Sequence, residues 1–340
     1  MEEIGQKYDF TVIGTASTVS VLKVRQMPQI GRSTGVENDN FDEVYHGGKG
    51  FNICAALARL GQRVYPVLTY ADIRQRAYLR DFTERYGLPR DGIQDPPEDS
   101  RGTTLMIQDE QNNHITMITQ YARRLPGSDY FRVQTMDPRF FENSRMAILT
   151  VPMSMNTPGI TEALEKTDIP LALSMMYDPY SFPPPLLRRL LLRSELIFMN
   201  EGEAAYICRE FGLGAVTDLF ALGRTRLIAV TLGEKGSTVY QKRAEDGSFV
   251  SCHVDAVRPE TDAPDCVGAG DAYVSGFLYG YLRGLGAEEC AGLGGTLAAF
   301  VIEKDGSTTN LPDEPTLLKR YAAIRKDGSR MNRSDEAALL

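Results

Sequence analysis

Short apolar runs alternate with longer amphipathic segments along most of this chain, and the alternation predicts its secondary structure. β-Branched and aliphatic runs predict buried strands, while apolar residues at helical spacing predict helices packed against them. Gly61 and Gly87 are placed to end the first two helices. Strands are expected at 8–14, 19–24, 44–45, 64–69, 147–151, 170–174, 195–200 and 226–231, and helices at 51–60, 73–86, 157–165, 186–193, 201–211, 268–283, 287–303 and 314–324.

From residue 146 onward, strands and helices alternate regularly. This order predicts βαβ units around a mainly parallel sheet, and therefore an α/β fold. Hairpins are expected at 103–119, with a turn at 109–113, and at 239–254, with a turn at 246–247.

Two β-rich stretches, 15–46 and 103–119, interrupt the α/β pattern. We expect them to form a small lid on one α/β body. No linker rich in Pro, Gly or Ser divides the chain. Residues 1–326 are therefore expected to form a single domain with this lid, and 327–340 a polar C-terminal tail.

Composition narrows the class of partners. The 340 residues include 37 basic and 45 acidic ones, a formal net charge of −8, so no basic footprint for nucleic acid is present. Five cysteines without a CxxC pair are typical of a reduced protein. The sequence shows neither a secretory pattern nor an apolar run long enough for a membrane span. We expect a cytoplasmic protein that binds neither nucleic acid nor membrane.

The segment DCVGAGDAY, residues 265–273, carries the strongest chemical signal. Gly268, Ala269 and Gly270 open a long helix, where unpaired backbone amides and the helix dipole favour an anion. Small side chains let a ligand approach that backbone closely. Asp271 follows in the first turn, where its carboxylate either caps the helix or accepts a proton from an attacking hydroxyl. Spacing alone leaves both interpretations open.

Three further segments are ambiguous when each is taken alone. GGKGFN at 47–52 is a glycine-rich turn before a helix, and Lys49 is either solvated or in contact with an anion. NEGE at 200–203 is either a helix cap or a set of amide and carboxylate groups for Mg²⁺ and phosphate. TLGEKG at 231–236 is a tight turn at the carboxyl end of a strand, where open α/β sheets bind ligands.

Together, in this order and spacing, the four segments resemble the ribokinase-like (PfkB) family of carbohydrate kinases, from Phe10 to about Pro312. GGKGFNICAALARLG is similar to the N-terminal signature of that family, and DCVGAGDAYVSGF to its C-terminal signature. The resemblance implies a three-layer ribokinase-like fold with a β-sheet lid and a mostly parallel central sheet of about eight or nine strands. It also implies transfer of the γ-phosphate of ATP to a hydroxymethyl group of a sugar.

The resemblance implies a role for each motif residue. Mg²⁺ would be held through water by Glu203, and K⁺ near Asp265 and the loop around Gly306. The lids of two copies would pair in a homodimer. The implied site consists of the general base Asp271 with the anion hole Gly268, Ala269 and Gly270; the acceptor-binding residues Gly47, Gly48, Lys49 and Asn52; and the ATP-binding residues Asn200, Glu203, Thr231, Gly233 and Gly236.

The sequence departs from the family pattern at two positions. The first strand of the family continues as G-x-x-x-x-D, and here the matching residue is Val19, so the usual carboxylate for sugar hydroxyls is missing. Either Ser17 or Ser20 replaces it through a shifted register, or the acceptor is unusual. Cys266 replaces a common threonine and is a poor hydrogen-bonding residue, which weakens the prediction of a K⁺ site.

Three alternatives remain open besides a free-sugar kinase. A sugar-phosphate kinase of the phosphofructokinase or tagatose-phosphate type would need cations, for which Lys23, Arg25 and Arg101 are candidates. A nucleoside kinase is suggested because DEQNNHITMIT resembles the lid hairpin of some bacterial nucleoside kinases. A non-catalytic binding protein is the third, and the intact GAGD, N-x-x-E and glycine-rich motifs argue against it.

Overall fold

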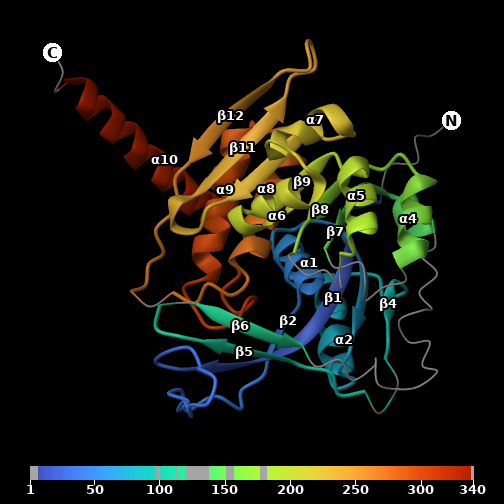
Figure 1. Ribbon diagram of the computed structural model, residues 1–340, viewed down its shortest axis with the longest axis vertical. Coiled ribbons are helices and arrows are strands. Elements are labelled where there is room, and N and C mark those ends of the chain that lie inside the picture. Colours follow the sequence, from blue (N-terminus) through green and yellow to red (C-terminus); the bar gives the residue numbers. More distant parts are fainter. Residues whose placement is uncertain are drawn as a thin grey trace.

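A long, mostly parallel sheet forms the middle layer of the protein (Figure 1). The computed structural model describes residues 7–337 except 97, 99, 112, 119–137, 151–156, 177–181 and 263. The main path of the sheet runs β12-β11-β10-β9-β8-β7-β1-β3-β4, and its antiparallel pairs are β10–β11 and β11–β12. These strands are β1 Tyr8–Lys23, β3 Val64–Tyr70, β4 Ile93–Gln94, β7 Ser144–Leu149, β8 Leu171–Ser174, β9 Leu196–Asn200, β10 Leu227–Thr231, β11 Ser237–Lys242 and β12 Phe249–Val254.

Helices cover both faces of this sheet, which confirms the predicted three-layer α/β fold. Phe10 and Val12 of β1 point into an apolar cluster with α1, α8 and α9, whereas Ile13 points into a second cluster with α5 and α6. The helices are α1 Lys49–Arg59, α2 Gln75–Tyr86, α3 Arg139–Glu142, α4 Thr157–Glu165, α5 Pro184–Arg193, α6 Glu201–Phe211, α7 Leu219–Leu222, α8 Ala269–Tyr281, α9 Ala287–Val301 and α10 Glu314–Ala337, with 3₁₀ turns η4 Val216–Asp218 and η5 Gly233–Lys235.

The C-terminal helix is longer than predicted. A helix was expected at 314–324 and a tail at 327–340, but α10 continues to Ala337 and projects from the body (Figure 1). Its first turns pack on α9 through Leu317 and Tyr321. The last three residues lie outside the described part of the chain.

The prediction of two separate strands at 8–14 and 19–24 was wrong. β1 is one strand of 16 residues, because no glycine or proline follows Gly14 to interrupt the β-branched stretch. Its first half pairs with β3 and β7 in the central sheet. Its second half pairs with β2 Tyr45–Gly47 and β5 Thr104–Gln108.

The lid is therefore an extension of the central sheet (Figure 1). The expected hairpin forms it, with β5 paired to β6 His114–Ile118. Two predicted strand ends, Thr119 and Val151, lie outside the described residues. The second hairpin is confirmed by β11 and β12, with Gly247 in the turn between them.

The chemical motifs meet at one edge of the sheet. Parallel strands β9 and β10 end together there, with Asn200 and Thr231 as register partners. The start of α1 lies on β1, and the start of α8 contacts the start of α1. This is the carboxyl edge at which open α/β sheets bind ligands. Among the described residues, no helix combines the length and apolarity that a membrane crossing requires.

Candidate active site

The first turn of α8 is open to a ligand. Gly268 is its N-cap with φ +82°, and no side chain caps the helix. A methyl group at Gly268 would lie 2.5 Å from Cβ of Ser307, so this position requires glycine both for its conformation and for close packing. A methyl group at Gly270 would meet no described atom within 4 Å. The turn thus combines a tightly held N-cap with an accessible backbone.

Asp271 is held by two residues of α1. Asp271 is buried, with only 7% of the residue exposed. Asn52 Nδ2 donates to Oδ2 at 2.8 Å, and Lys49 Nζ donates to Oδ1 at 3.2 Å. Asp271 therefore faces another helix across the edge of the sheet. The structure brings the GGKGFN and GAGD motifs together around one carboxylate.

Two glycines allow α1 to lie directly on β1. Gly48 has φ +99°, and a methyl group there would lie 2.7 Å from the Thr15 carbonyl oxygen. A methyl group at Gly47 would lie 2.9 Å from Ser307 Oγ and 3.6 Å from Val19 Cγ2. Gly47, Val19 and Ser307 therefore border the space in front of Asn52. The four residues expected to contact the acceptor gather in one place.

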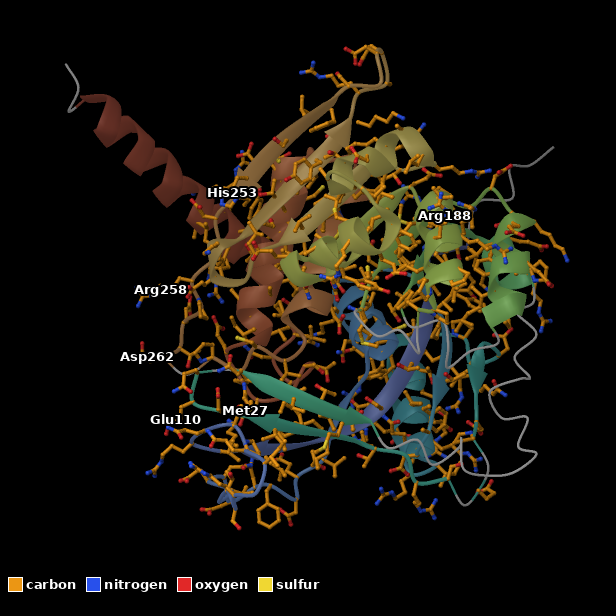
Figure 2. All side chains as sticks on the ribbon, in the orientation of Figure 1. Met27, Glu110, Arg188, His253, Arg258 and Asp262 are labelled. Carbon is orange, nitrogen blue, oxygen red and sulfur yellow. The ribbon has the colours of Figure 1, made fainter. Side chains whose placement is uncertain are left out.

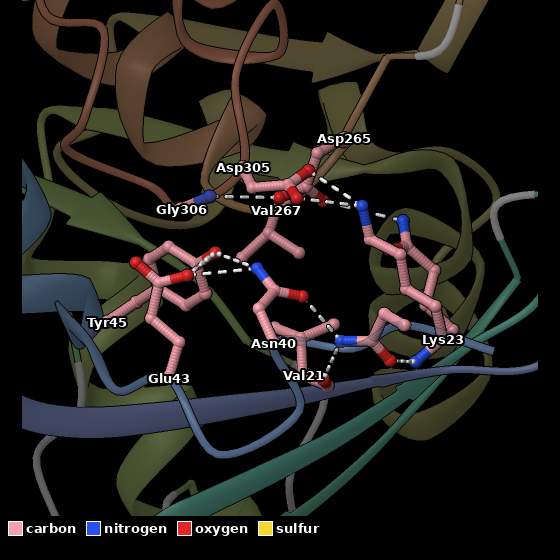
Figure 3. Close-up of polar contacts among 11 residues, drawn as sticks. Val21, Lys23, Asn40, Glu43, Tyr45, Asp265, Val267, Asp305 and Gly306 are labelled. Atoms are coloured by element: carbon pink, nitrogen blue, oxygen red, sulfur yellow. Dashed lines mark hydrogen bonds and ion pairs between the residues drawn. The ribbon is translucent and has the colours of Figure 1, made fainter. Parts of the chain in front are cut away.

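Val19 belongs to an apolar cluster. It is 9% exposed and packs with Val21 and Met106, and the partly buried Tyr45 and Val267 cover them. Figure 3 shows Val267 of the loop before α8 above Val21 of β1, with the Tyr45 ring to one side. The wall formed at Val19 is thus apolar and reaches Val267, the residue next to Gly268.

Asn200 and Glu203 form a capping box at the start of α6. Asn200 Oδ1 accepts from the Glu203 backbone amide at 2.8 Å, and Glu203 Oε2 accepts from the Asn200 backbone amide at 2.7 Å. The predicted helix cap is confirmed. The glutamate is buried by this arrangement, and its role toward Mg²⁺ stays a prediction.

The turn after β10 is tied to α8. The Leu232 amide donates to the Gly236 carbonyl, and Gly236 has φ +88° with no room for a side chain beside Val254. Tyr273 donates its hydroxyl to Ser237 Oγ at 2.8 Å. Burial raises the pKa of Tyr273, which keeps the hydroxyl neutral as a donor.

A cavity of about 580 Å³ adjoins this turn. It lies between β11, β12, α9 and α10, and its walls include Val254, Asp255 and Val257. None of its lining residues belongs to the acceptor group around Asp271. None of them belongs to the turn or to the other residues expected to bind ATP, and the cavity approaches the turn through Val254 and Asp255, which pack against Gly236.

Asp265 joins three segments around the start of α8. Its carboxylate, 4% exposed, accepts from the backbone amides of Val267 and Gly306 at 3.2 and 3.1 Å and from Gln108 Nε2 of the lid at 3.4 Å. Figure 3 shows Asp265 with Val267 and Gly306, together with the ion pair between Lys23 and Asp305.

Both carboxylate oxygens of Asp265 already accept hydrogen bonds, so the group does not fit a directly held divalent ion, and its role toward K⁺ stays a prediction. A K⁺ ion would share the carboxylate with two backbone amides. In the described part of the chain, no group of three His, Cys, Asp or Glu side chains is placed to hold a metal ion. Mg²⁺ would accordingly be held mainly by phosphate oxygens and water.

The three cations considered for an acceptor phosphate have other partners. Lys23 Nζ pairs with both carboxylate oxygens of Asp305 at 2.8 Å. Arg25 lies 3.8 Å from Glu37, and Arg101 Nη1 donates to the Ser100 carbonyl at 2.7 Å. The structure gives the sugar-phosphate alternative no support from these residues.

Sequence reasoning missed Ser307 and Gln108. Ser307 contacts Asn52, and Gln108 contacts Asp265. The only signal for Ser307 was its place directly after Gly306, and Gln108 had none. Both contacts join segments more than 150 residues apart in the sequence.

Nucleoside kinases and a ribokinase resemble this chain along most of its length. A nucleoside kinase of Methanothermobacter thermautotrophicus is 23% identical over 93% of this chain and 96% of the relative. A Burkholderia thailandensis nucleoside kinase in complex with inosine has a TM-score of 0.73 at 21% identity, covering 92% of this chain and 98% of that one. A ribokinase from Cryptococcus neoformans var. grubii in complex with ADP has a TM-score of 0.75 at 15% identity, covering 92% and 99%.

The structural likenesses establish a ribokinase-like fold. Residues 12–314 match the pfkB family of carbohydrate kinases, which confirms the resemblance noted in the motifs. The match covers both glycine-rich helix starts and the turn after β10. The chain therefore belongs to the pfkB family of carbohydrate kinases and is a kinase.

Proposed function

We propose that this protein transfers the γ-phosphate of ATP to a hydroxymethyl group on a sugar ring, with Asp271 as general base. The observation that carries the proposal is the buried Asp271 carboxylate, held by Lys49 and Asn52 at the uncapped start of α8. The acceptor hydroxyl would give its proton to Asp271 as its oxygen bonds to the γ-phosphorus. The bond to the β-phosphate oxygen breaks, and ADP leaves.

The start of α8 would stabilise the charge on the transferring group. Backbone amides of Gly268, Ala269 and Gly270 would serve as the anion hole, because phosphoryl transfer depends mainly on positioning and electrostatic stabilisation. The turn containing Thr231, Gly233 and Gly236 would bind ATP. Mg²⁺ bound to the phosphates would be oriented through water by Glu203 next to Asn200.

Among acceptors, a nucleoside is the favoured candidate. The apolar cluster around Val19 cannot accept hydrogen bonds from free sugar hydroxyls, and leaving such groups unpaired is unfavourable. A nucleoside carries the same hydroxymethyl group and adds the apolar surface of a base. The names of two of the similar proteins, both nucleoside kinases, agree with this.

A panel of acceptors tests the proposal. ADP release would be measured with ribose, fructose, a sugar phosphate, adenosine, cytidine and inosine at fixed MgATP. We expect at least one nucleoside to give a higher kcat/KM than ribose or fructose. Efficient turnover of ribose would exclude the nucleoside preference, and no turnover with any sugar-containing acceptor would contradict the proposed function.

Val19→Asp tests the acceptor wall directly. Restoring the carboxylate is expected to raise kcat/KM for ribose or fructose, because it supplies the missing acceptor for sugar hydroxyls. Val19→Asn, which has nearly the same volume without the charge, is the matched control. A wild type that already uses ribose well and an inactive Val19→Asp variant would show that β1 is aligned incorrectly.

We also infer a homodimer formed through the lid. Its described surface exposes large apolar side chains, and a lid with few strands has open edges that pairing would cover. Figure 2 shows Met27 and Glu110 at this end of the molecule, far from Arg188 of α5. The exposed residues are Ile30, Val36, Phe41, Val44, Ile115 and Met117.

Light scattering tests the dimer at the concentrations used for activity. A mass of twice 37.7 kDa is expected for the wild type. Ile115→Ser with Met117→Ser should lower it, whereas Leu222→Ser, an exposed apolar residue outside the lid, should not. A monomeric wild type would contradict the inference.

A further inference from the structure

Ser307 lies where the two glycine-rich motifs meet. The residue is 6% exposed, and its hydroxyl is 2.8 Å from Asn52 Oδ1. Its Cβ lies against Gly268, and its Oγ lies against Gly47. The Ser307 hydroxyl therefore contacts Asn52, which in turn contacts Asp271.

The chemistry of the three groups fixes the direction of each hydrogen bond. An ionised carboxylate only accepts, so the amide of Asn52 must turn its NH₂ group toward Asp271. The carbonyl oxygen of the same amide then faces Ser307, whose O–H donates. If the amide reversed, its oxygen would face the carboxylate and repel it.

The loop that carries Ser307 is anchored on both sides. Asp305 pairs with Lys23 of the lid, and the Gly306 amide donates to Asp265. Thr308 Oγ1 donates to the His46 carbonyl in β2 at 3.2 Å. The contacts of Asp305 and Gly306 hold the Ser307 hydroxyl in place from neighbouring segments, as a group that orients another side chain must be held.

We propose that Ser307 is a positioning residue for the kinase reaction: its hydroxyl fixes the orientation of the Asn52 amide, and Asn52 in turn fixes the carboxylate of Asp271. This inference rests on the proposed function of Asp271. Without the hydroxyl, the buried Asn52 Oδ1 loses its donor, so the amide rotates or reverses to find another. Asp271 then loses its fixed geometry, and the chemical step slows.

A double-mutant cycle tests this chain of contacts. Ser307→Ala is expected to lower kcat about tenfold and to leave the KM for MgATP almost unchanged. The melting temperature should fall by only a few degrees, since one buried hydrogen bond is removed. In an Asn52→Ala background, Ser307→Ala should change kcat by less than about twofold, because the residue through which it acts is gone.

Thr308→Val is the matched control. It removes a hydroxyl from the same loop that contacts β2 and not Asn52, and kcat is expected to stay within about twofold of the wild type. An equal loss of kcat from Ser307→Ala in both backgrounds, or no loss in the wild type, would overturn the role of Ser307. Neither result would contradict the proposed function. A wild type without ATP-dependent phosphoryl transfer would overturn the proposed function and the inference with it.

Discussion

The starts of α8 and α6 are built on the same pattern and behave differently. Each has a glycine at the second helical position and an acidic residue at the third, in Gly268-Ala-Gly-Asp271 and Asn200-Glu-Gly-Glu203. In α6 the acidic residue folds back and bonds to the N-cap amide. In α8 it extends across to Lys49 and Asn52 of α1.

Two small differences account for this. Asn200 accepts from a backbone amide of its own helix, whereas Gly268 has no side chain and caps nothing. Glu203 has one methylene more than Asp271, and that length lets it reach back. The start of α6 thus satisfies its own polar groups and stabilises the fold. At the start of α8 the Ala269 amide donates to the Cys266 carbonyl at 3.3 Å, no side chain caps the helix, and the backbone at Gly270 stays open to a ligand.

The largest effect is expected from Asp271→Asn. It should lower kcat at least about a hundredfold, the usual contribution of a positioned general base, while the fold and ATP binding remain. Steady-state kinetics and calorimetric ATP titration measure the two effects. Asp271→Glu should also lose activity, because the longer side chain is displaced from Lys49 and Asn52. Normal turnover by either variant would contradict the catalytic role given to the start of α8.

A paired substitution at the second helical position should have the next largest effect. Gly270→Ala has room for its methyl group, so the melting temperature should hold while kcat/KM for ATP falls at least about tenfold as the methyl group blocks the anion. Gly202→Ala in α6 is the control and should leave kcat/KM within about twofold. Equal losses of kcat/KM in the two variants would mean that the starts of α6 and α8 have the same function.

Asn200→Ala is expected to act mainly on stability. Loss of the capping box should lower the free energy of unfolding by about 1 kcal/mol, or a few degrees in Tm. Thermal denaturation measures this, with Thr217→Ala outside the cap as a reference. An unchanged Tm together with a large rise in the KM for MgATP would show that this helix start serves ligand binding rather than stability.

The smallest effect is expected from exchanging K⁺ for Na⁺ at constant ionic strength. Backbone amides already bind both oxygens of Asp265, so we expect kcat to fall about twofold, within the range of a weak screened interaction. Asp265→Asn should remove the difference between the two ions. A tenfold dependence on K⁺ would show that the cation, rather than the amides, orders the start of α8.

Much of the fold could be read from local patterns. The helices before Gly61 and Gly87, the hairpin at Gly247 and the strands from β7 to β10 follow from periodicity and glycine placement, which act over a few residues. The motifs likewise identified Asp271, Lys49 and Asn52 before their contacts were known. Local patterns did not show that β1 is continuous, because the alternation looks the same in one long strand and in two short ones.

The sequence by itself determined which groups are present and that GGKGFN and GAGD each open a helix. Only the tertiary structure decided which of these groups meet. Asn52 and Asp271 are 219 residues apart, and Asn52 and Ser307 are 255 apart. Such contacts depend on how helices pack on both sides of one sheet, and no spacing along the chain encodes them. The role of Ser307 is therefore visible only where α1, α8 and the loop after α9 come together.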